Sequence, residues 1–168
     1  MLVVLVRHGP ATPVGHDGVR TDAERPLSVG GRRRTEEAAA GLATLLPGAV
    51  TLLASPLRRA QDTAEVLAGA LDVTGSVVTS DALALGGPYE QIGDEPALGR
   101  ATGSVVLVGH EPSLAGLASW WLTGQADLRI AWRKAGALAI DHPGTPRPGG
   151  GTLAWFLPPR VLRRLGGA

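Results

Sequence analysis

Leu2-Val3-Val4-Leu5-Val6-Arg7-His8-Gly9 opens the chain: five apolar residues run directly into an arginine and a histidine. The same pattern occurs twice more. Val50–Ala54 leads into Ser55–Arg59, and Val105–Val108 leads into Gly109–Pro112. Short apolar runs rich in β-branched residues are typical of strands buried on both faces of a sheet. The sequence therefore predicts three buried strands, each followed closely by Arg or His.

The polar residues after these strands predict a shared pocket. In open α/β sheets, ligands bind in the crevice beyond the carboxyl ends of the strands. If the three strands are parallel neighbours, four side chains converge there, namely Arg7, His8, Arg59 and His110. Two arginines and two histidines indicate a dianionic ligand, and phosphate is the obvious one.

Helical segments alternate with the strands, so the predicted fold class is α/β. We expect a three-layer α/β/α domain with a mostly parallel central sheet, spanning residues 1–168 as a single domain. Ser28 is expected to cap one helix and Ser55 another, with Pro56 at the first helical position of the second. Further expected elements are an edge strand at 77–79, a weak helix within 89–100, a helix over 112–122 and a terminal helix over 160–166. The segments 135–140 and 152–157 predict a C-terminal hairpin that completes the sheet.

Composition narrows the class of protein. Hydrophobic residues make up 44% and charged residues 18% of the 168 residues, which is typical of a globular chain. The absence of Cys excludes a thiolate metal site and a cysteine nucleophile. Apolar stretches stay far below the roughly 18 residues of a membrane span, so a cytoplasmic domain with no membrane association is expected.

Three motifs in this order resemble the histidine phosphatase superfamily, which also contains the cofactor-dependent phosphoglycerate mutases. They are Arg7-His8-Gly9, Ser55-Pro56-Leu57-Arg58-Arg59-Ala60-Gln61-Asp62-Thr63 and Gly109-His110-Glu111-Pro112. The short chain and Arg25-Pro26-Leu27-Ser28-Val29-Gly30-Gly31 are most similar to the small phosphohistidine phosphatase branch, the SixA type. The resemblance covers residues 2 to about 140 and implies a phosphoglycerate-mutase-like fold.

The resemblance implies catalytic roles for His8, Arg7, Arg59 and His110. A neutral His8 would attack phosphorus, which requires its other ring nitrogen to be held as a donor, for example by a backbone carbonyl. Arg7 and Arg59 would bind the phosphoryl oxygens as planar forks. His110 is expected to be protonated and to stabilise the charge that develops during transfer.

Three further residues are candidates for substrate binding. Gly9 would let the backbone approach the phosphate, although a turn glycine is the alternative. Arg25 would either contact substrate or form a salt bridge within its loop. Many family members carry a carboxylic general acid on the loop after the second helix, and this chain has Pro88 where the small branch often has that acid. Glu90 is the nearest candidate, with Asp81 and Asp94 behind it, and a solvated position is the alternative for each.

These residues predict a metal-independent phosphatase that forms a covalent phosphohistidine on His8, with no cofactor. A weak general acid favours phosphohistidine protein or another activated phosphoryl donor as substrate. The alternatives are a broad-specificity phosphomonoesterase acting on small phosphate esters and a catalytically inactive phosphate-binding module. The resemblance to the small branch disfavours mutase activity, because that branch lacks the long insertions that enclose a bisphosphate and residues 72–104 are equally short here.

A nucleic-acid partner is a further alternative, because of Arg32-Arg33-Arg34 and the basic residues at 160–164. Glu36 and Glu37 interrupt this charge, and no nucleic-acid-binding motif is present. We therefore expect a solvated charged face and no nucleic-acid partner. His16 and His142 lie in loops rich in Gly and Pro and are expected at the surface. The sequence does not predict the oligomeric state.

Overall fold

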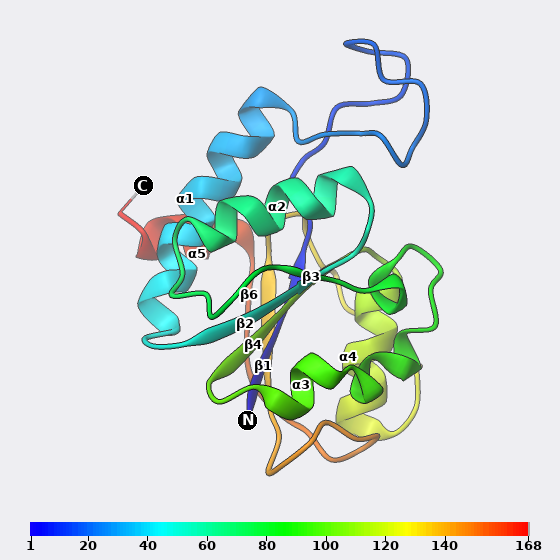
Figure 1. Ribbon diagram of the computed structural model, residues 1–168, viewed down its shortest axis with the longest axis vertical. Helices are drawn as coiled ribbons and strands as arrows, with labels where there is room; N and C mark the ends of the chain where they lie inside the picture. The colour runs from blue at the N-terminus through cyan, green and yellow to red at the C-terminus, as the bar shows by residue number, and fades with distance from the viewer. Residues whose placement is uncertain (168) are drawn as a thin grey trace.

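The computed structural model describes residues 1–167, and a mixed six-stranded sheet forms its centre (Figure 1). The strands are β1 (Leu2–Arg7), β2 (Val50–Ala54), β3 (Val78–Thr79), β4 (Ser104–Gly109), β5 (Ala137–Asp141) and β6 (Thr152–Leu157). Their order is β3-β2-β4-β1-β5-β6. The first four are mutually parallel, whereas β5 and β6 are antiparallel to their neighbours. The predicted sheet, its edge strand at β3 and its closing hairpin are confirmed.

Helices cover both faces of the sheet. They are α1 (Val29–Leu45), α2 (Arg58–Ala68), α3 (Pro96–Arg100), α4 (Ser113–Thr123) and α5 (Pro159–Leu165), with 3₁₀ turns η1 (Asp81–Leu83) and η2 (Tyr89–Asp94). Helices α1, α2 and α5 lie on one side, and α3 and α4 lie on the other (Figure 1). The predicted three layers and the expected helices within 89–100, 112–122 and 160–166 are confirmed, although the weak helix is split between η2 and α3.

Alternation along the strands divides the apolar core into two halves. On β1, Val4 and Val6 pack under α1 and α2, whereas Val3 and Leu5 pack toward α4. Successive strand side chains point to opposite faces, so a strand that is covered on both sides needs apolar residues at every position. This requirement explains why the first run of the sequence is apolar without interruption.

The sequence predicts the start of α1 correctly but not the start of α2. Ser28 caps α1 as expected, since its Oγ accepts a hydrogen bond from the Gly31 amide at 3.0 Å. The prediction that Ser55 caps the next helix is wrong. Helix α2 begins at Arg58 with Leu57 at the N-cap and no side-chain cap. Ser55 is instead buried, and its Oγ lies 2.8 Å from His110 Nε2. The same oxygen accepts a hydrogen bond from the Leu57 amide at 3.3 Å, ahead of the first turn of α2, so it does not cap the helix.

His142 also departs from expectation. It was predicted at the surface, but only 1% of it is exposed, and its ring packs edge-on against Trp121 at 5.2 Å between centroids. The residue directly follows β5, and its amide donates to the carbonyl of Met1. Its place beside β1 therefore buries a residue that the Gly- and Pro-rich sequence around it suggested was exposed. His16 is exposed, as predicted.

Within residues 1–167, no helix combines the length and apolarity needed to cross a bilayer.

A close helix contact provides a test of the packing. Helices α1 and α5 approach so closely that a Cβ on Gly41 would lie 1.8 Å from the Leu162 carbonyl oxygen. We expect Gly41→Ala to lower the free energy of unfolding by about 1–3 kcal/mol, because the helices must move apart. Urea denaturation measures this change.

Gly30→Ala is the matched control on the same helix. A Cβ at Gly30 meets nothing within 4 Å, so the substitution should raise the unfolding free energy by about 0.5–1 kcal/mol through helix propensity alone. Equal effects of the two substitutions would show that the α1–α5 contact is not as close as described.

Candidate active site

The carboxyl ends of β1 and β4 bring two histidines together. His8 follows β1, and its amide donates a hydrogen bond to the carbonyl of Gly109, the last residue of β4, at 3.0 Å. His110 comes next on the chain, and the two imidazole centroids lie 5.0 Å apart. Both residues are almost fully buried. The parallel pairing of β1 with β4 thus places one histidine beside the other.

Hydrogen bonds define the tautomer of His8. Its Nδ1 lies 2.7 Å from the carbonyl oxygen of Gly9. A carbonyl only accepts, so Nδ1 carries the hydrogen and donates it. The other nitrogen, Nε2, then has a free lone pair, and it accepts a hydrogen bond from the Nε–H of Arg59 at 3.3 Å. This orientation matches the one that a nucleophilic imidazole needs.

Arg59 enters from the first turn of α2 and is held by a loop residue. Its Nη1 donates to the backbone carbonyl of Asp22 at 2.8 Å, and its Nη2 pairs with the Asp22 carboxylate at 3.0 Å. Its side chain is only 4% exposed, so this cation is both buried and oriented. Its neighbour Arg58 is 63% exposed and pairs with Asp62 along the helix, away from the histidines.

Arg7 is positioned by the segment that precedes β5. Its Nη1 donates to the backbone carbonyl of Trp132. Its Nε is buried, and no hydrogen-bond partner for it lies within residues 1–167. A buried guanidinium nitrogen without a partner costs free energy unless a ligand supplies an acceptor. The side chain is therefore ready to receive an anion.

The second histidine also has one engaged and one open nitrogen. His110 Nε2 lies 2.8 Å from the Ser55 hydroxyl oxygen, whereas its buried Nδ1 has no partner in the described part of the chain. Burial and the positive charge of Arg59 lower the pKa of His110 to about 4. At pH 7 this pKa corresponds to a neutral ring, whereas the sequence analysis expected a protonated one.

Burial has the same effect on His8. It lowers the pKa of His8 to about 3, with the charges of His110, Arg59 and Lys134 acting in the same direction and the Gly9 carbonyl opposing them. The imidazole is consequently neutral at physiological pH, as a nitrogen nucleophile must be.

The three secondary candidates take different places. The Gly9 amide donates to Thr63 Oγ1 at 3.0 Å, and a Cβ at Gly9 would lie 2.2 Å from Thr35 Oγ1, so packing accounts for this glycine. Arg25 forms the loop salt bridge, with Asp22 at 2.9 Å. Glu90 is exposed in η2. Its exposure leaves it without the burial that would keep a carboxyl protonated.

Sequence reasoning missed three residues of this site. Asp22 orients Arg59 from a loop 37 positions away, and no sequence pattern links the two. Lys134 precedes β5, and burial together with the charges of Arg25, Arg7 and Arg59 lowers its pKa. Glu111 follows His110. Burial raises the pKa of its carboxyl, while Arg7 opposes this rise. Its place directly after a motif histidine is a signal that could have found it.

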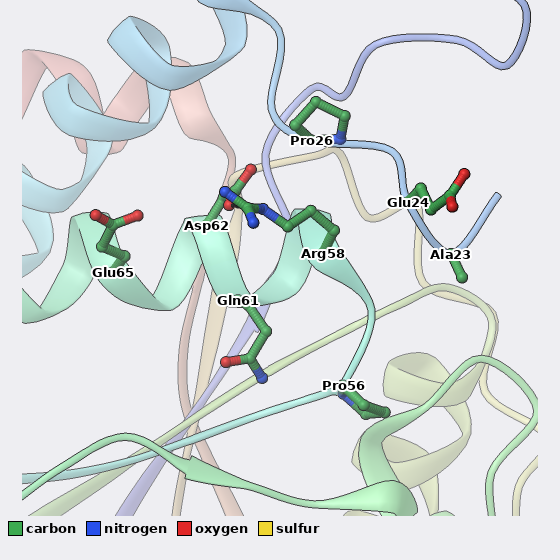
Figure 2. Close-up of a pocket in the computed structure, with 8 residues that line it drawn as sticks. All are labelled: Ala23, Glu24, Pro26, Pro56, Arg58, Gln61, Asp62 and Glu65. Atoms are coloured by element: carbon green, nitrogen blue, oxygen red, sulfur yellow. Dashed lines mark hydrogen bonds and ion pairs between the residues drawn. The ribbon is translucent and has the colours of Figure 1, made fainter. Parts of the chain in front are cut away.

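A larger hollow lies beside this site and is distinct from it. Its volume is about 830 Å³. Figure 2 shows the side chains that line it, which come from the loop at 23–26, from Pro56 and from helix α2, where Arg58, Gln61 and Asp62 lie. None of the residues that line it belongs to the histidine–arginine cluster. The Arg58–Asp62 pair crosses its wall, so an anion here would meet a cation that is already neutralised.

Comparison with known proteins relates the chain to a family. Residues 3–84, just under half of the chain, match the model of the histidine phosphatase superfamily (branch 1). This match agrees with the resemblance found in the sequence and supports the predicted phosphatase activity. No curated protein sequence matches it.

Solved structures of histidine phosphatases share the fold across nearly the whole chain. The protein histidine phosphatase SixA in complex with tungstate aligns with a TM-score of 0.80 at 23% identity, over 96% of this chain and 99% of SixA. A structure described as phosphohistidine phosphatase SixA of Agrobacterium tumefaciens gives 0.66 at 21%, over 93% and 96%. A mycobacterial glucosyl-3-phosphoglycerate phosphatase with inorganic phosphate gives 0.62 at 21%, over 95% and 99%. These likenesses support the phosphoglycerate-mutase-like fold.

The lowered pKa values yield a test by NMR. We expect the ¹⁵N signals of His8 and His110 to show neutral rings from about pH 8 down to about pH 5 in phosphate-free protein, because both pKa values lie below this range. Inorganic phosphate should raise the pKa of His110, since a nearby dianion favours the charged ring. A His8 ring that gains its charge near neutral pH would contradict the buried, neutral nucleophile.

Proposed function

We propose that the protein is a metal-independent phosphatase that works through a covalent phosphohistidine on His8. One observation carries this proposal: the Gly9 carbonyl binds Nδ1 of His8 and leaves the lone pair of Nε2 facing the Arg59 guanidinium. A nucleophile thus lies beside a cation suited to phosphoryl oxygens. Within residues 1–167, no three His, Cys, Asp or Glu side chains cluster as a metal site would require.

In the first chemical step, Nε2 of His8 forms a bond to phosphorus while the bond from phosphorus to the leaving group breaks. Arg59 moves its hydrogen bond from Nε2 to a phosphoryl oxygen, and Arg7 supplies its unpartnered Nε to another. In the second step, the oxygen of a water molecule forms a bond to phosphorus while the bond from phosphorus to Nε2 breaks. Inorganic phosphate and neutral His8 are released, and the proton that the water loses passes to solvent. The substrate's own charge is neutralised throughout by groups that need little reorganisation.

We propose that His110 becomes charged only when substrate is present. Its open Nδ1 and its distance of 5.0 Å from His8 support a place for it against the transferred phosphoryl group. The incoming dianion offsets the burial that otherwise keeps the ring neutral. A protonated His110 then donates to the oxygens on which negative charge develops.

The substrate class follows from the leaving group. An alkoxide leaves slowly unless an acid protonates it, and Glu90, the predicted acid, is exposed. Burial raises the pKa of the Glu111 carboxyl, but the nearby positive charge of Arg7 favours its ionised form. A phosphoramidate nitrogen can carry a proton before its bond breaks. Phosphohistidine protein or another activated phosphoryl donor is therefore the preferred substrate.

Replacement of the nucleophile tests the mechanism. His8→Ala should lower hydrolysis of p-nitrophenyl phosphate by about 10⁴-fold or more, because the covalent route is lost. The wild-type protein should keep its activity in EDTA and yield an acid-labile phosphoenzyme after rapid quenching. His16→Ala, at an exposed loop histidine, is the matched control and should retain full activity. Phosphate binding without turnover in the wild type would instead indicate an inactive phosphate-binding module.

A substrate comparison tests the preference. We expect kcat/KM to be higher for a phosphohistidine peptide than for glucose 6-phosphate, because the phosphoramidate needs no general acid. Steady-state assays with both substrates at the same pH measure the ratio. A higher value for the sugar phosphate would favour the broad-specificity phosphomonoesterase and would require an acid in the site.

A further inference from the structure

A basic groove has Arg7 on its wall, but neither of the two histidines lines it. It has a volume of about 360 Å³ and five cationic side chains line it: Arg7, Arg34, Arg133, Lys134 and Arg163. None of its nine lining residues carries a carboxylate. Helices α1 and α5 contribute Arg34 and Arg163, and the segment before β5 contributes the two central cations. Like charges gathered on one wall repel each other, so the groove is best suited to an anion.

Most of this charge is uncompensated. Arg163 pairs with Glu37 at 3.4 Å. For Arg34, Arg133 and Lys134, by contrast, no ion-pair partner lies anywhere in residues 1–167. The buried Nε of Arg7 also lacks an acceptor. The groove therefore differs from the neighbouring stretch of α1, where Arg32 and Arg33 are both paired with glutamates.

The segment that carries the central cations is held in place. Trp132 is buried, and its Nε1–H donates a hydrogen bond to the Gly136 carbonyl at 3.0 Å. The Gly136 amide donates to the Arg133 carbonyl at 2.9 Å and so closes a turn. Ala135 adopts a left-handed backbone with φ of 60°, a conformation that is unfavourable for a residue other than glycine. Its amide thereby donates to the Arg7 carbonyl at 3.0 Å. The turn thus couples Lys134 to the strand end that carries the nucleophile.

We propose that this groove binds a second anionic group, a carboxylate or a phosphate, on the same substrate molecule whose phosphoryl group is transferred to His8. This inference rests on the proposed function, because Arg7 forms part of both the phosphoryl site and the groove wall. The second anion belongs either to a small phosphorylated acid or to an acidic side chain beside a phosphorylated protein residue. The groove thereby makes the enzyme selective for doubly anionic substrates.

Two matched inhibitors test the groove. Phosphoglycolate and phosphoglycolamide have the same size and both carry a phosphate, but a neutral amide replaces the carboxylate in the second. The ratio of their inhibition constants, measured with p-nitrophenyl phosphate as substrate, therefore reports the effect of the carboxylate charge alone. We expect phosphoglycolate to bind about five- to tenfold more tightly, in line with a hydrogen bond to a charged group. Both are measured at one ionic strength, because salt screens exposed charges. Equal inhibition would overturn the proposal.

Charge-matched variants assign the effect to the groove. Arg34→Gln combined with Lys134→Gln should reduce the preference for phosphoglycolate to within twofold. The control, Arg100→Gln combined with Arg164→Gln, removes the same charge from exposed positions at the ends of α3 and α5 and should keep the preference. Only the ratio of the two inhibitors is compared, so a general loss of activity does not affect the result. A preference that survives in the groove variant, or is lost equally in the control, overturns the proposal.

Peptides distinguish the two sources of the second anion. A phosphohistidine peptide flanked by Glu, compared with one flanked by Gln, reports on acidic protein side chains in the same two variants. If the wild-type protein prefers the Glu-flanked peptide and the groove variant does not, the second anion comes from a phosphoprotein. If the wild-type protein prefers phosphoglycolate but shows no preference between the peptides, the second anion belongs to a small acid.

Calorimetric binding of both inhibitors to the His8→Ala protein separates this inference from the mechanism. A carboxylate preference there supports the groove even if His8 is not the nucleophile.

Discussion

The parallel pairing of β1 with β4 is the interaction on which the site depends. It carries His8 and His110, which lie 102 positions apart in the chain, to the same edge of the sheet, and the bond from the His8 amide to the Gly109 carbonyl joins the two strand ends. The backbone beyond β1 then supplies the Gly9 carbonyl that sets the tautomer of His8. The pairing of the strands therefore sets the position of the proposed nucleophile, and the backbone directly after β1 sets which of its nitrogens carries the hydrogen.

Positive charge surrounds the two histidines of the site. The cations Arg7, Arg59 and Lys134 lie near two buried, neutral imidazoles. Asp22 pairs with Arg59, and Arg25 pairs with the same Asp22 carboxylate. Burial alone lowers the pKa of each histidine, and the nearby cations lower it further. A phosphate dianion would reverse the electrostatic part of this effect. These pKa values are consistent with the proposed roles, in which a neutral His8 attacks phosphorus and His110 becomes charged beside the substrate.

The sequence predicted strands and helix starts correctly where the deciding contacts involve residues close together in the chain. The uninterrupted apolar runs at β1, β2 and β4 reflect helices on both faces, and Ser28 caps α1 with an amide three residues away. The same reasoning failed at Ser55, because a hydroxyl that resembles a helix cap in sequence is bonded to His110 from another strand. His142 failed for the same kind of reason, since the packing of β5 against β1 buries a residue in a polar, turn-rich stretch.

The order of strands and motifs along the chain was enough to predict an α/β fold and the four residues that gather at its edge, because hydrophobic periodicity and the residues after each strand are properties of neighbouring positions. Only the tertiary structure decided which nitrogen of His8 carries the hydrogen and which has the lone pair. It also decided that burial lowers the pKa of His110, and that Asp22 and Lys134 lie near these residues. Hydrogen bonds, burial and Coulomb interactions between groups far apart in sequence determine these features, and no local pattern encodes such distances.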